Sequence, residues 1–192
     1  MKRGDIQFAW SDDVAIAYQV VGDGPIDLLY LPPWFSNLDL QWEHPLHAHF
    51  LERLASFSRL IIVDRRGWGC SDRVTPGSFP PLEVAADDLI AVLDAVGSSS
   101  AALFAGAEAG WVASIAAATH PARFSAMVLF QSSATWVRTK ETPWNPSPEE
   151  WQDQEAYWLG ANTASFTEGY VRRYEPSLVG DRLAIEYLAK LG

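Results

Sequence analysis

The sequence predicts an α/β protein with a doubly wound, mostly parallel β-sheet. Short apolar runs at 26–31, 60–63, 101–105 and 125–130 are typical of strands that are buried on both faces. Segments with helical periodicity lie between these runs. This alternation of strands and helices is the pattern of a sheet covered by helices on both sides.

The chain begins with a predicted hairpin. Residues 6–10 and 14–21 alternate in polarity and carry β-branched and aromatic side chains, and the turn residues 22–25 (Gly-Asp-Gly-Pro) end the second strand. The first predicted helix covers residues 43–56, with four apolar residues at helical spacing: Leu46, Phe50, Leu51 and Leu54.

A second helix is predicted over residues 82–96. Pro80 and Pro81 precede its first turn and Gly97 ends it, an arrangement typical of helix boundaries. Strand 101–105 then leads into a third helix.

That third helix, predicted over residues 108–119, follows a sharp turn centred on Ala107. A strand, a tight turn and a helix, with small residues two places on either side of the centre, form the context of a nucleophile elbow. Ala105 and Ala109 are these small flanks, and Gly110 lets the helix pack closely. We expect no nucleophile at position 107, because a methyl group cannot attack a substrate.

The character of the chain changes after Gln131. Residues 139–150 hold three prolines and mixed polar residues, which predicts a loop. Residues 148–159 and 178–191 have helical patterns, whereas the pattern over residues 160–174 is ambiguous.

Four segments resemble the α/β-hydrolase family, in the order in which the family carries them. They match its first hairpin, its third strand with the oxyanion loop, its D-x-R-G-x-G-x-S-D turn and the end of its elbow helix: Asp12–Pro25, Leu29–Trp34, Asp64–Asp72 and His120–Arg123. The likeness is greatest to bacterial members that also occur joined to nucleotide cyclase or regulatory domains. It implies a core over residues 1–135 and a helical cap region over residues 136–192.

The resemblance also implies the parts of a site. The family has a serine where this chain has Ala107, and it has a glycine where this chain has Pro33. The backbone N–H groups of Trp34 and Glu108 are expected to form the oxyanion hole. The family's catalytic acid and histidine follow two further strands, which would lie beyond Gly192. We therefore expect a fold truncated after its sixth strand and the start of the cap.

Two other nucleophiles are possible. Glu108 would be central in a shifted Gly106-x-Glu108-x-Gly110 pattern, but the spacing that matches the family places Ala107 there. A carboxylate at a helix N-terminus is the ordinary interpretation of Glu108. Cys70 lies in a turn beside Gly69, without an elbow or a nearby histidine in the sequence, which disfavours nucleophilic chemistry.

The histidines do not form a clear site. His44 and His47 have a spacing that two metal ligands use, with Glu43 adjacent, but no further ligand is clustered with them, so we expect no metal and no cofactor. His49 lies on the same helix. His120 is expected to cap the end of the elbow helix.

The chain has nine tryptophans. Four of them fall beside loops at the carboxyl ends of strands, where α/β sheets bind ligands: Trp34, Trp68, Trp111 and Trp136. We expect a pocket lined by Trp34, Ala107, Trp111 and Trp136, although packing alone would also explain these residues. The tryptophans of the cap region are expected to pack within it: Trp144, Trp151 and Trp158.

Composition excludes some partners. The formal net charge of −10 and the pI near 4.7 argue against nucleic acid and anionic membranes. No apolar stretch is long enough to span a bilayer and no signal peptide begins at Met1. The single cysteine indicates a reducing compartment, so we expect a cytoplasmic protein.

Three classes of function remain. We expect a protein that binds a small apolar or aromatic molecule without hydrolysing it. A carboxylic-ester hydrolase, or an inactivated or truncated form of one, is the rival. The third class is an interaction module, in which strand 125–130 pairs in a homodimer or with a missing C-terminal complement.

Overall fold

The structure is a computed structural model that describes residues 3–33, 35–75, 80–153, 167, 169–172 and 175–191. The chain divides into two compact units, residues 1–132 and residues 133–192, and each is described by itself.

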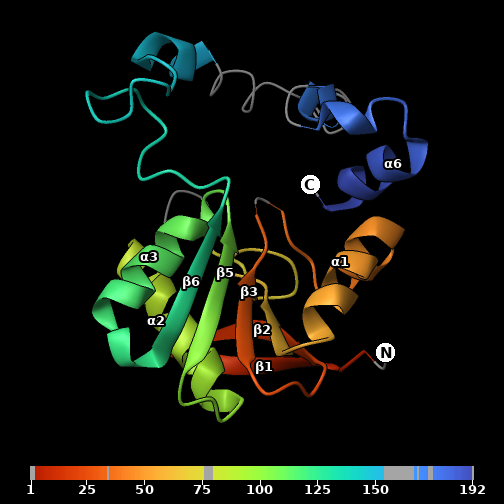
Figure 1. Cartoon of the computed structure of the whole chain (residues 1–192), viewed down its shortest axis with the longest axis vertical. Coiled ribbons are helices and arrows are strands. Elements are labelled where there is room, and N and C mark those ends of the chain that lie inside the picture. Colours follow the sequence, from red (N-terminus) through yellow and green to blue (C-terminus); the bar gives the residue numbers. More distant parts are fainter. Residues whose placement is uncertain are drawn as a thin grey trace. The chain divides into compact units, whose positions relative to one another are not determined.

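The first unit contains a six-stranded sheet (Figure 1). Its strands are β1 (Ile6–Ser11), β2 (Val14–Val21), β3 (Asp27–Leu31), β4 (Arg59–Val63), β5 (Ala101–Gly106) and β6 (Phe124–Phe130). The strand order is β1-β2-β4-β3-β5-β6, in which β4, β3, β5 and β6 are mutually parallel. β2 pairs antiparallel with β1 and β4, so the predicted mostly parallel sheet is confirmed.

Helices cover both faces of this sheet. α1 (Pro45–Ala55) lies on one face, and α2 (Leu82–Ala95) and α3 (Ala109–Thr119) lie on the other (Figure 1). Alternate strand residues accordingly supply two separate apolar cores. The core under α2 and α3 includes Ile16, Leu29, Ile61 and Leu103, and the core under α1 includes Ala17, Leu28, Leu60 and Leu51.

Most predicted boundaries agree with the structure to within two residues, and α1 shows the cause of one two-residue difference. The helix was expected from residue 43, but residues 40–42 form a separate 3-10 turn and α1 begins at Pro45. Proline fits the first helical position because it has no N–H to leave unsatisfied. Leu46 was expected on the apolar face; this is wrong, because it is 66% exposed, whereas Leu51 is fully buried.

The second unit contains short helices. Residues 148–153 are helical, and the rest of the helix expected over 148–159 lies outside the described residues. α6 (Arg182–Leu191) begins later than expected, after a 3-10 turn (Pro176–Leu178). Gly180, with a φ of +86°, separates the two, and the Asp181 carboxylate caps α6 by accepting the Ala184 N–H at 3.1 Å.

β6 forms one edge of the sheet and is exposed along its length. Every residue from Ser125 to Phe130 is exposed, including four large apolar side chains: Met127, Val128, Leu129 and Phe130. Because successive strand residues point to opposite faces, both faces of β6 are exposed. An apolar edge of this kind can pair with another strand.

Candidate functional site

The turn between β5 and α3 holds its central residue in a strained conformation. Ala107 has a φ of +46°, a left-handed value that costs a non-glycine residue free energy, and it is only 2% exposed. Its N–H donates to the carbonyl oxygen of Phe130 at 2.9 Å, and its own carbonyl accepts the Gly110 N–H at 3.2 Å. The sharp turn predicted at Ala107 is therefore present.

Close packing explains the two glycines of this turn. A Cβ on Gly106 would lie 3.0 Å from the ring of Pro33, and one on Gly110 would lie 2.1 Å from the Oγ of Ser132. The turn is thus enclosed by the loop after β3 and by the end of β6. The predicted close packing at Gly110 is confirmed, and its neighbour is Ser132.

Glu108 directly follows Ala107 and forms an ion pair with Arg65. Its side chain makes no cap for α3, although Glu108 is the N-cap residue. The Arg65 guanidinium also lies over the ring of Trp68, 5.8 Å from its centroid. This pairing was not predicted from sequence, because the two residues lie 43 positions apart. The charge of Glu108 is therefore balanced by Arg65 as well as by the helix dipole.

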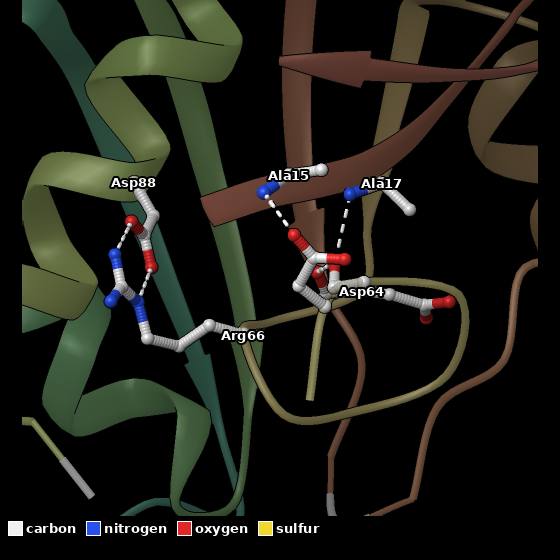
Figure 2. Close-up of polar contacts among 7 residues, drawn as sticks. Ala15, Ala17, Asp64, Arg66 and Asp88 are labelled. Carbon is white, nitrogen blue, oxygen red and sulfur yellow. Dashed lines mark hydrogen bonds and ion pairs between the residues drawn. The ribbon is translucent and has the colours of Figure 1, made fainter. Parts of the chain in front are cut away.

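Arg65 belongs to the Asp64–Asp72 turn, which is hydrogen-bonded to β2. The Oγ of Ser71 accepts the Ala17 N–H at 2.7 Å, and the Asp72 carboxylate accepts the Ala15 N–H at 2.8 Å. Ser71 also donates to the carbonyl of Asp64 at 2.5 Å. Figure 2 shows the hydrogen bonds of Ala15 and Ala17 to this turn. These side chains therefore hold the turn through hydrogen bonds to the backbone.

Asp64 is the fully buried carboxylate of the same turn. One oxygen accepts the N–H groups of Leu38 at 2.9 Å and Cys70 at 2.8 Å. Burial raises the pKa of Asp64, and these hydrogen bonds oppose that shift. A Cβ on Gly69 would lie 2.1 Å from this oxygen, so the turn requires glycine there.

The thiol of Cys70 lies beside this buried carboxyl group. Burial, and then the charge of Asp64, raise the pKa of Cys70, so its reactive thiolate is disfavoured. This environment agrees with the expectation that Cys70 is not a nucleophile.

The histidines lie in three different settings. His44 is buried at the start of α1, and burial lowers the pKa of the half-buried His47 to about 4. His49 is exposed on the same helix. His120 ends α3 through its backbone N–H, whereas a cationic ring was expected to cap the helix, and this ring contacts the Asp87 carboxylate on α2 at 3.1 Å. Within the described part of the chain, no three potential metal ligands cluster.

The tryptophans expected to line a pocket fall in different parts of the structure. Trp111 lies half-buried in the first turn of α3, three residues after Glu108. Trp136 belongs to the second unit and stacks on Trp151 at a centroid distance of 6.3 Å. Trp34 lies outside the described residues, and so does Trp158, which was expected to pack within the cap region.

None of the helices that the structure describes combines the length and apolar character needed to cross a membrane.

Fold and turn together define a class, the α/β proteins with a tight strand-to-helix turn at the carboxyl edge of a mostly parallel sheet. The chain belongs to the alpha/beta hydrolase fold family, whose sequence profile matches residues 28–173. A comparison with curated proteins found no match.

Solved structures of hydrolases are similar to this chain. One is a hydrolase from Pseudomonas aeruginosa PA01, with 24% identity and a TM-score of 0.70, over 98% of this chain and 66% of that one. Another is a serine-to-alanine mutant of the meta-cleavage product hydrolase from Pseudomonas fluorescens IP01, complexed with acetates. It has 22% identity and a TM-score of 0.69, over 97% of this chain and 64% of that one. A third is the 2-hydroxy-6-oxo-6-phenylhexa-2,4-dienoate hydrolase from Rhodococcus sp. strain RHA1. It has 15% identity and a TM-score of 0.67, over 99% of this chain and 70% of that one. The chain thus spans about two thirds of the length of the first of these structures.

Proposed function

We propose that this chain is a non-hydrolytic member of its family that binds a small apolar or aromatic molecule, as a sensor does. Ala107 carries the proposal. It occupies the centre of a strained, enclosed turn, where the family resemblance implies a serine. Strain of this kind is retained where the surrounding structure demands it, and it often marks a functional site.

A carboxylic-ester hydrolase is the rival function, and the histidines argue against it. His120 lies at the opposite end of α3 from Ala107, roughly 16 Å away along an 11-residue helix. His44 directly precedes α1 and His47 lies on it, and α1 covers the other face of the sheet from α3. A serine at position 107 would therefore need a base from elsewhere to take its proton.

The binding mode follows from the groups beside Ala107. The N–H of Glu108 lies at the start of α3, where backbone donors and the helix dipole favour a ligand oxygen. Trp111 follows one turn later and offers an aromatic face. We propose that the ligand carries a carbonyl group next to an apolar or aromatic body.

Tryptophan fluorescence tests this proposal. Titration with acetophenone should quench the fluorescence saturably, and Trp111→Phe should reduce the amplitude. Trp144→Phe is the control, because Trp144 is 74% exposed. Linear quenching that is equal in both variants would rule out a site at Trp111.

A second function is favoured by the exposure of β6. We propose that this edge pairs with another β-strand, in a homodimer of the 192-residue chain or with a complement that its longer relatives carry. The strand has no proline, lysine or other charge between Ser125 and Phe130 to oppose such pairing.

We further propose a cytoplasmic location, because Cys70 is a free thiol. Kinship with bacterial members joined to nucleotide cyclase or regulatory domains would suit a sensor.

A further inference from the structure

Two adjacent arginines of the Asp64–Asp72 turn reach carboxylates on two different helical segments. Arg65 pairs with Glu108 at the start of α3. Arg66 makes a two-pronged pair with Asp88 of α2, with one contact of 2.6 Å, as Figure 2 shows. All four side chains are largely buried, with exposed fractions of 12% and 18% in the first pair and 11% and 3% in the second. The two pairs thus have similar chemistry and burial, but they join the turn to different helical segments.

The sheet order gives the Arg65–Glu108 pair a special position. Arg65 follows the end of β4 by two residues, and Glu108 follows the end of β5 by two residues. β3 lies between those strands and runs parallel to both. The ion pair therefore crosses the carboxyl end of β3, at the point where Pro32 and Pro33 lead the chain away from the sheet.

The pair also bears on the backbone beside Ala107. The Glu108 side chain makes no hydrogen bond that caps α3, and its carboxylate pairs with Arg65. A charge-assisted contact at a largely buried position restricts the Glu108 side chain and with it the peptide unit that joins Ala107 to Glu108. This peptide carries the N–H that faces the ligand in the proposed function.

We propose that Arg65 is a positioning residue: its ion pair with Glu108 fixes the Ala107–Glu108 peptide and so sets the affinity of the site for a carbonyl ligand. The ligand part of this inference rests on the proposed function. Arg66 stabilises the turn through α2 and has no part in the site. If the role of Arg65 were purely structural, substitution of either arginine would have an equivalent effect on the Ala107–Glu108 peptide.

Amide hydrogen exchange tests the positioning role without any ligand. The N–H of Gly110 donates to the carbonyl of Ala107 at 3.2 Å, so it reports on this peptide directly. The N–H of Trp111 donates to the carbonyl of Glu108 at 3.1 Å and reports on the next peptide. Arg65→Met should speed their exchange about tenfold, the usual effect of losing one charge-assisted hydrogen bond. Arg66→Met, the matched control, should leave both amides unchanged and instead speed exchange in α2.

The affinity for acetophenone gives the second measurement. Arg65→Met should weaken binding about tenfold, whereas Arg65→Lys, which keeps the cation, should recover part of the loss, and Arg66→Met should bind as the unchanged protein does. Glu108→Gln attacks the pair from its other end and should reproduce the exchange result if Arg65→Met fails to fold.

The outcomes separate the two proposals. Equal effects of the Arg65 and Arg66 variants on Gly110 and Trp111 would overturn the positioning role. If the unchanged protein does not bind acetophenone, the proposed function fails, and the exchange measurement still decides the role of Arg65.

Discussion

The N–H of Ala107 donates a hydrogen bond to the carbonyl oxygen of Phe130 at 2.9 Å. This contact joins the turn after β5 to the last residue of β6, and Gln131 beyond it also has a positive φ, of +54°. Two left-handed residues therefore stand side by side at the carboxyl edge of the sheet. The hydrogen bond shows how the strain at Ala107 is held in place by a neighbouring strand.

The strain at Ala107 predicts how the position tolerates change. Ala107→Val should lower the free energy of unfolding by about 2 kcal/mol, because a β-branched side chain is a genuine outlier at positive φ. Ala107→Gly should be close to neutral, since relief of strain offsets the lost methyl burial. Urea denaturation measures both, and a valine variant as stable as the glycine variant would contradict the geometry.

Ala107→Ser should not create an esterase. A serine is a weak nucleophile without an adjacent base, and the histidines of this chain lie at the far end of α3 or on α1. Turnover of 4-nitrophenyl acetate should match that of the unchanged protein. A covalent adduct with a fluorophosphonate probe, formed by the serine variant alone, would show that a base had been missed.

Asp64→Ala should be strongly destabilising. The substitution leaves the N–H groups of Leu38 and Cys70 buried without their acceptor, at about 1–3 kcal/mol each. Asp64→Asn retains an acceptor oxygen and carries no charge to bury, so it should cost much less. Thermal unfolding of the two variants distinguishes them, and similar losses would mean that the charge of Asp64 is required.

The lowered pKa of His47 predicts a smaller free energy of unfolding in acid. Burial, and then the charge of His44, lower the pKa of His47 from 6.5 to about 4. The unfolded chain therefore binds more protons than the folded protein between these pH values, so the free energy of unfolding should fall as the pH falls through this window. The loss is at most about 3 kcal/mol, and less because His47 keeps some exposure.

His47→Gln provides the control for this prediction. Urea denaturation at pH 7 and about pH 4.5 should show a smaller difference for this variant than for the unchanged protein. Asp64, whose pKa burial raises, acts in the opposite direction above its ordinary pKa of 3.8, and it is present in both proteins. Identical pH dependence in the two proteins would exclude His47 as the cause.

The exposed β6 edge predicts self-association of the 192-residue chain. Light scattering at micromolar concentration should give a mass above that of a monomer, and Val128→Glu should lower it, because a charge on an edge strand opposes pairing. Ile26→Glu is the matched control, since Ile26 is 50% exposed and Val128 is 56% exposed, but Ile26 lies before β3. A monomer in all three proteins would reject the proposal.

The strands were predictable from sequence because their signals are local. The apolar run Leu60–Val63 must be buried on both faces, and it forms β4 within the central sheet. Likewise, only small side chains suit the turn around Ala107, so its position followed from Ala105 and Ala109. Periodicity and residue size carry this information without knowledge of the partners.

The contacts of the charged side chains were not predictable in this way. Arg65 and Arg66 are neighbours, but nothing in their spacing indicates that one reaches Glu108 and the other Asp88. Those destinations depend on the strand order, which places β3 between β4 and β5. The exposure of Leu46 was missed for a related reason, since its spacing fits a helical stripe but its place in the first turn of α1 faces solvent.

The Asp64–Asp72 turn has a consequence for folding kinetics. Its side chains bond to partners 22 to 57 positions away, on β2, α2, α3 and the loop after β3. Contacts across such long loops form once the intervening chain is ordered, so they are expected late, after the rate-limiting barrier to folding. Substitutions in this turn should therefore shorten the lifetime of the native state while leaving the rate of refolding nearly unchanged.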